Sequence, residues 1–112
     1  MVYPLTAPLL DFLVLSIIKY QDNYGYEISQ QLKNLSNIKD SALYPVLKKL
    51  SDNNFVEAYD QPFQGRNRKY YKLTDTGQLH CIYLGEEWNA HVEAIHEITN
   101  KALDSQRGEQ YE

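Results

Sequence analysis

A cluster of positive charges in the middle of the chain is the feature that points most directly to chemistry. Four cations fall within seven residues, and no acid lies between Gly65 and Thr74: they are Arg66, Arg68, Lys69 and Lys72. Gly65 permits a sharp turn, and arginine at a hairpin tip can reach a phosphate or a narrow minor groove. Within this cluster, the residues predicted to contact DNA are Arg66, Asn67, Arg68 and Lys69.

A second candidate surface lies some twenty residues earlier. Apolar residues at helical spacing predict one buried stripe, formed by Leu43, Val46, Leu47 and Leu50. The opposite face carries side chains suited to DNA, namely Ser41, Tyr44, Pro45 and Lys48, with Lys49 at its edge. Hydroxyl groups can bond to phosphate or base edges, and lysines neutralise phosphate. Taken alone, the two lysines also fit an ordinary solvated face, and Tyr44 also fits a structural role.

The residues give little support for an enzyme active site or a metal site. His91 and His96 are five positions apart, whereas helical metal pairs prefer three or four. No Ser-His-Asp set, phosphate-cradling glycine loop or HExxH motif occurs. We expect no enzyme, no cofactor and no metal; a small enzyme with a site in a dimer cavity is the weakest alternative. The single cysteine, Cys81, excludes an intrachain disulfide and fits a reducing cytoplasm.

The overall charge argues at first sight against a nucleic-acid partner. The net charge is −4, but residues 1–74 carry +2 and residues 75–112 carry −6. Because the Debye length is about 8 Å at physiological salt, a distant acidic element does not cancel a local basic surface. Asp11 interrupts the first apolar stretch and no basic region precedes it, so we expect no signal peptide and no membrane span. The expected location is the cytoplasm.

The periodicity predicts three helices followed by a hairpin. The first helix covers residues 9–18 with Pro8 near its start, and the second covers 24–35, where Gly25 allows close approach to the first helix. Asp40 or Ser41 caps the third, which has Pro45 within about one turn of its start. It ends near residues 53–54, because asparagine is the non-glycine residue best able to take a left-handed position at a helix end. The period then changes to two, with a strand from residue 56, a loop over 61–67 and a return strand over 68–74.

A long final helix follows, capped by Thr74 or Asp75, with Gly77 in its first turn. From residue 78 to about 103 it would span about 38 Å, and the polar tail 105–112 is expected to fray. Its apolar stripe exceeds what the small first domain can cover, and a two-fold copy is the commonest partner for such a surface. The predicted dimer and effector residues are Leu84, Trp88, Val92 and Ile95. For Trp88, packing in the dimer core and stacking on a ligand both remain open.

The expected fold is mostly α with a small β hairpin. Residues 1–74 would form a winged helix-turn-helix domain that binds DNA, and residues 75–112 a dimerisation helix with its tail. In such folds the third helix enters the major groove and the hairpin is the wing beside it.

Three segments also resemble one known family. Residues 24–28, 41–50 and 65–74, followed by Gly77, are similar in order and spacing to the PadR family of bacterial transcriptional regulators, and the resemblance spans roughly residues 9–100. It implies dimeric repressors on an inverted repeat, with Tyr44 and the wing cations contacting DNA. A single long last helix is similar to the short subfamily, which includes multidrug sensors whose matching tryptophan stacks on flat aromatic ligands. Asn54, where glycine is common, and Ala42, where a small polar residue is common, depart from the family pattern.

The resulting hypothesis is a sequence-specific DNA-binding regulator, acting as a homodimeric repressor and released by a flat aromatic molecule. The alternative is a winged-helix module that binds another protein and no DNA.

Overall fold

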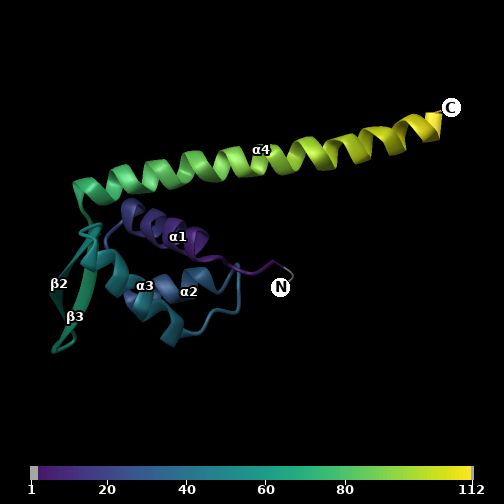
Figure 1. The fold of residues 1–112 in the computed structure, drawn as a ribbon. Coiled ribbons are helices and arrows are strands. Elements are labelled where there is room, and N and C mark those ends of the chain that lie inside the picture. Colours follow the sequence, from purple (N-terminus) through teal and green to yellow (C-terminus); the bar gives the residue numbers. More distant parts are fainter. Residues whose placement is uncertain (1–2, 112) are drawn as a thin grey trace.

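The computed structural model describes the backbone of residues 3–111 and the side chains of residues 3–104. Over this range the helices and the sheet of α1–α3 and β1–β3 form a head, from which a long helix projects (Figure 1). The elements are α1 (Ala7–Tyr20), β1 (Asn23–Tyr24), α2 (Gly25–Leu32), α3 (Asp40–Asp52), β2 (Val56–Phe63), β3 (Arg66–Leu73) and α4 (Asp75–Tyr111). The winged helix with one long C-terminal helix is therefore confirmed.

The core of the head is built from one face of each helix and the inner face of the sheet. α1 starts where the Thr6 Oγ1 accepts from the Leu9 N–H, and Pro8 lies in its first turn as expected. The predicted stripe on α3 is buried at all positions except Val46, which is half-buried. The fully buried side chains that meet in the centre include Leu15, Ile18, Ile28, Leu43, Leu47, Leu50 and Val56.

The sheet differs from the prediction in two ways. Its order is β1-β3-β2 with antiparallel pairing, and the two residues of β1 were not foreseen. The prediction of a seven-residue loop over 61–67 is wrong, because both strands continue to a two-residue turn at Gln64 and Gly65. Both turn residues have positive φ, at 50° and 78°, a geometry that matches the twist of paired strands.

The second helix is shorter than predicted. Tyr24 belongs to β1, and Leu35 lies beyond the end of α2 and is exposed. Gly25 does not face α1; a Cβ built on it would meet Tyr44 Cε1 of α3 at 3.7 Å, an ordinary contact distance.

The start of α3 also corrects the expectation. Neither Asp40 nor Ser41 is its cap, because Lys39 occupies that position without a side-chain hydrogen bond. The Asp40 carboxylate instead accepts a hydrogen bond from Ser29 Oγ and lies 3.1 Å from Lys33 Nζ, which joins α3 to α2. Pro45 lies in the second turn of the helix, later than expected.

The end of α3 matches the prediction. Asn54 takes a left-handed φ of 61°, and its N–H and that of Phe55 close back on Ser51 O and Leu50 O at 3.0 and 2.9 Å. These two bonds satisfy carbonyls that the helix end would otherwise leave open.

A tight joint connects the head to α4. Thr74 Oγ1 accepts from the Gly77 N–H at 2.9 Å, which confirms Thr74 as the cap. A Cβ on Gly77 would lie 1.9 Å from Phe55 O, so only glycine fits there. α4 then packs along α1, where a Cβ on Gly85 would meet the Phe12 ring at 3.4 Å. It continues to Tyr111, beyond the expected end near residue 103, and so spans about 56 Å.

No helix of the described residues has the length and apolar character to cross a membrane.

Candidate nucleic-acid interface

The outward face of α3 presents the polar side chains that the sequence singled out. Ser41, Tyr44, Pro45 and Lys48 are all exposed, and Tyr44 is 60% exposed. Lys48 Nζ lies 3.0 Å from Asp52 one turn away, and both side chains are open to water. Such surface pairs contribute about 0–1 kcal/mol, so a phosphate can replace the aspartate at little cost.

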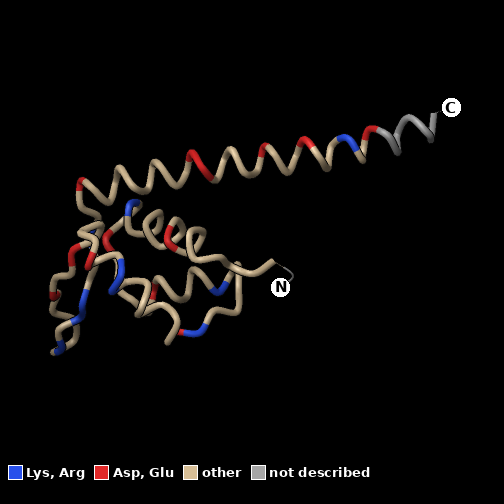
Figure 2. Tube along the Cα trace, viewed as in Figure 1, with Lys and Arg blue, Asp and Glu red and all other residues tan. Residues whose placement is uncertain are grey.

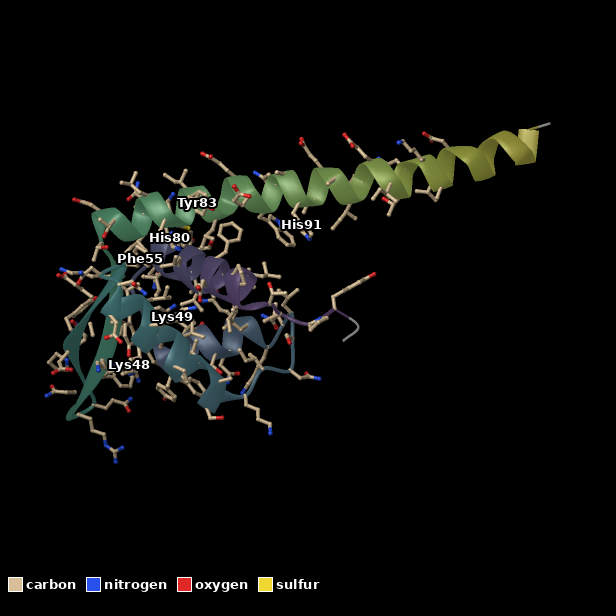
Figure 3. All side chains as sticks on the ribbon, viewed as in Figure 1. Lys48, Lys49, Phe55, His80, Tyr83 and His91 are labelled. Atoms are coloured by element: carbon tan, nitrogen blue, oxygen red, sulfur yellow. The ribbon has the colours of Figure 1, made fainter. Side chains whose placement is uncertain are left out.

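Lys49 has a different environment from its neighbour. Its Nζ lies 2.7 Å from Asp11 Oδ2 of α1, and the Asp11 side chain is only 14% exposed. The other Asp11 oxygen is buried, with no hydrogen-bond partner among the described side chains. In Figure 3, Lys49 lies nearer α1 and Lys48 farther from it. This ion pair joins the third helix to the first, an arrangement that sequence spacing does not reveal.

The wing residues divide between the two faces of the hairpin. In β3, Arg66 and Arg68 alternate with Asn67 and Lys69, and the buried Tyr71 shares the side of the second pair. Asn67 and Lys69 therefore extend the inner face, while the two arginines lie on the outer face. Figure 2 shows cations gathered at the free end of the hairpin and acids spaced along α4. Nearer the head, Lys72 Nζ lies 3.5 Å from Glu57 of β2.

Aromatic rings cover the outer face of the wing beside Arg68. Its guanidinium carbon lies 4.0 Å from the centre of the Tyr24 ring and 3.5 Å from that of Phe63. The Tyr24 and Tyr70 ring centres are 5.4 Å apart. These two contacts to Arg68 were not predicted, because one depends on the unforeseen strand β1 and the other on residue 63 being in a strand.

The row of rings continues to Tyr59, whose centroid lies 5.8 Å from that of Tyr70. The Tyr59 hydroxyl donates to Asp22 at 2.8 Å, and this hydrogen bond to a carboxylate raises the pKa of the tyrosine.

The predicted dimer residues share one face of α4. Leu84 and Val92 are half-buried, whereas Trp88 and Ile95 are 38% and 43% exposed. Leu84 packs on the head, and Trp88 lies next to His91, with ring centres 6.0 Å apart. Beyond the reach of α1 the same face has no cover within the described residues.

Near the start of α4, three rings form a stack that was not predicted. The His80 ring lies parallel to Phe55 at 4.2 Å and 6.0 Å from Tyr83 (Figure 3). The stack fastens α4 to the segment that leaves α3. Among the described residues, no group of three or more histidines, cysteines or acids could hold a metal ion.

A winged-helix head with an exposed polar third helix and a cationic hairpin defines the class of winged-helix regulators. Residues 14–81 match the transcriptional regulator PadR-like family, and this is more than half of the chain. The chain therefore belongs to the PadR-like family of transcriptional regulators.

Solved structures agree with this assignment. The crystal structure of smu.1704 from Streptococcus mutans is 46% identical, with a TM-score of 0.86 over 89% of this chain and 94% of that one. A PadR family transcription regulator from Clostridium difficile is 30% identical, with a TM-score of 0.74 over 80% and 97%. Bacillus subtilis PadR, solved in complex with operator DNA, is 27% identical, with a TM-score of 0.61 over 71% of this chain and 46% of its own.

Proposed function

We propose that this protein is a cytoplasmic DNA-binding repressor that reads an inverted repeat as a homodimer. The observation that carries the proposal is the pairing of an exposed Tyr44 face on α3 with cations at the tip of the neighbouring hairpin. The Bacillus subtilis relative in complex with operator DNA supports the same use of the fold.

In this proposal α3 enters the major groove and the hairpin lies along the adjacent backbone. Ser41, Tyr44, Pro45 and Lys48 face the groove. Since the hairpin carries cations on both faces, Arg66 and Arg68 would meet one strand, and Asn67 and Lys69 the other. Lys49 has a supporting role in this proposal, because its ammonium group is ion-paired with Asp11 and so holds α3 against α1.

The homodimer is proposed from the uncovered face of α4. Trp88, Val92 and Ile95 continue the face that packs on α1, and an apolar face at helical spacing is stabilised when a partner surface covers it. Residues 75–112 would then form the dimerisation unit and residues 1–74 the DNA-binding unit. Two heads carried on a pair of such helices can place their α3 helices in successive major grooves, about 34 Å apart.

A gel-shift titration tests the DNA-binding proposal directly. The probe is the inverted repeat nearest the protein's own promoter, measured across a salt series against a scrambled duplex. We expect log K to fall with log salt by about 0.9 for each phosphate neutralised. A protein-binding module, the alternative function, predicts weak binding to both duplexes with no such slope.

The effector part of the proposal rests on Trp88, the single tryptophan, whose emission reports on its site alone. We expect riboflavin, a planar aromatic probe, to quench this emission and to weaken operator binding, because an inserted ring changes the spacing of the heads. Trp88→Phe should keep DNA binding but lose the response of operator binding to riboflavin. If neither emission nor DNA affinity responds to planar aromatic compounds, the effector part is wrong while the DNA-binding part stands.

A further inference from the structure

The Arg68 guanidinium is held between two aromatic rings from different strands. Its Cζ atom lies 4.0 Å from the Tyr24 centroid and 3.5 Å from the Phe63 centroid. Tyr24 comes from β1 and Phe63 from the last position of β2, so the guanidinium bridges both neighbours of β3. Contacts of this kind stabilise one orientation of a side chain that otherwise samples many rotamers.

The edge of this guanidinium remains available. Its N–H donors lie in the plane of the group, so rings stacked on the flat faces leave them open. No carboxylate of residues 3–104 forms an ion pair with Arg68, whereas Lys48, Lys49 and Lys72 each have an acid partner. A flat fork of donors with fixed orientation matches two oxygens of one phosphate.

The two rings also fix the position of the Arg68 guanidinium relative to the helices proposed to read DNA. Tyr24 immediately precedes α2, and its ring lies beside Tyr70 of β3. Phe63 is 44% exposed and outside the core, and it precedes the Gln64-Gly65 turn. The orientation of Arg68 is thereby set relative to α2, and through α2 to α3.

We propose that Tyr24 and Phe63 are positioning residues that hold the Arg68 guanidinium edge-on to a DNA phosphate. The proposal rests on the proposed DNA-binding function and deepens it. It assigns a bidentate role to Arg68 and a DNA-dependent role to two aromatic residues that do not themselves touch DNA.

Phe63 is the better of the two residues to change, because it lies outside the core. We expect Phe63→Leu to weaken operator binding about fivefold to tenfold while the salt slope stays unchanged, since the charge remains. Phe63→Tyr keeps a ring and should bind as the wild type does. Arg68→Ala should lower the slope by about 0.9 for each protomer bound. Melting temperatures of all variants serve as the folding control.

A double-variant cycle separates positioning from a general structural role. Arg68→Lys keeps the charge but loses the flat fork, so it should weaken binding about as much as Phe63→Leu does. Adding Phe63→Leu to Arg68→Lys should then cost little more, because the two changes remove one shared interaction. Tyr24→Leu, compared with Tyr24→Phe, repeats the test from the other ring.

Three results would overturn the proposal: Phe63→Leu binding as tightly as wild type, Arg68→Ala leaving the salt slope unchanged, or fully additive losses in the cycle. Absence of any salt-dependent binding by the wild type is a different failure, since it removes the DNA-binding function itself.

Discussion

The head and the outer half of α4 differ in how their apolar side chains are covered. In the head, Leu15, Ile28 and Leu47 come from three helices and bury one another completely. On α4, Cys81 is buried and Leu84 is partly covered, but Ile98 and Leu103 remain exposed. The head is complete within one chain, whereas the outer half of α4 is stabilised by a second chain in the proposed dimer.

Charge separates the same two regions. Cations lie on the hairpin and on α3, and acids dominate α4 (Figure 2). With overall dimensions of 70 × 27 × 20 Å, the acidic outer part of α4 lies well beyond a Debye length of about 8 Å from the wing. The molecule can therefore combine a net negative charge with a locally basic surface.

The joint between the two regions should be the most sensitive position. Gly77→Ala places a Cβ against Phe55 O, where it would lie 1.9 Å away, so the backbone must move. We expect the free energy of unfolding to drop by about 3 kcal/mol or more, measured by urea denaturation. Gly65→Ala is the matched control: it has open space but a φ of 78°, and should cost about 1 kcal/mol. Similar losses in both variants would show that the joint tolerates movement.

A charge on the open face of α4 tests the difference in burial. Ile95→Glu should weaken self-association about a hundredfold, because the proposed dimer would bury an unpaired carboxylate. Sedimentation equilibrium gives the association constant, and circular dichroism should show an intact head. Leu79→Glu is the control, since Leu79 is 68% exposed and lies about 160° around the helix. If Leu79→Glu dissociates the protein and Ile95→Glu does not, the dimer uses the other face.

The adjacent lysines Lys48 and Lys49 should have opposite phenotypes within the head. Lys49→Met leaves the shielded Asp11 carboxylate unpaired and should lower the unfolding free energy by about 1–2 kcal/mol. Lys48→Ala should change stability by less than about 0.5 kcal/mol but lower the salt slope of DNA binding by about 0.9 per protomer. Urea denaturation and gel shift on the same pair give both numbers, and equal effects on either measure would refute the division of roles.

The smallest expected effect is on the stability of the fold at acid pH. The hydrogen bond from Ser29, and then that from Lys33, lowers the pKa of Asp40 below 3.8. The stabilisation is thus present above about pH 4 and is lost as pH falls through the lowered pKa. Asp40→Asn should therefore lose less stability than the wild type as the pH falls below about 4. Parallel acid-denaturation curves would contradict this, and both proteins should keep the same self-association, because the partners of Asp40 are Ser29 and Lys33 and not residues of α4.

Features that depend on neighbours in the chain were predictable. The stripe on α3, the left-handed Asn54 and the Thr74 cap follow from helical periodicity and short-range hydrogen bonds. The wing was recognised from its alternation, but its turn was placed within too long a loop. Gln64 is a non-glycine residue at positive φ, and turn propensity alone does not predict that conformation for glutamine.

Features that join distant segments were not predictable from one sequence. Strand β1 has two residues, too few to show alternation, and it exists because β3 pairs with it. The Lys49–Asp11 ion pair, the Arg68 sandwich and the fit of Gly77 against Phe55 each join residues brought together only by folding.

The amino-acid sequence by itself determined that this protein is a winged helix followed by one long acidic helix, because hydrophobic period, caps and charge clusters are local properties of the chain. Tertiary structure alone decided which cations remain open to a phosphate and which are engaged. The neighbouring lysines differ in partner: Lys48 pairs with the exposed Asp52 of its own helix, whereas Lys49 pairs with the shielded Asp11 of α1. A guanidinium likewise gains a fixed direction only where rings from two other strands close on it.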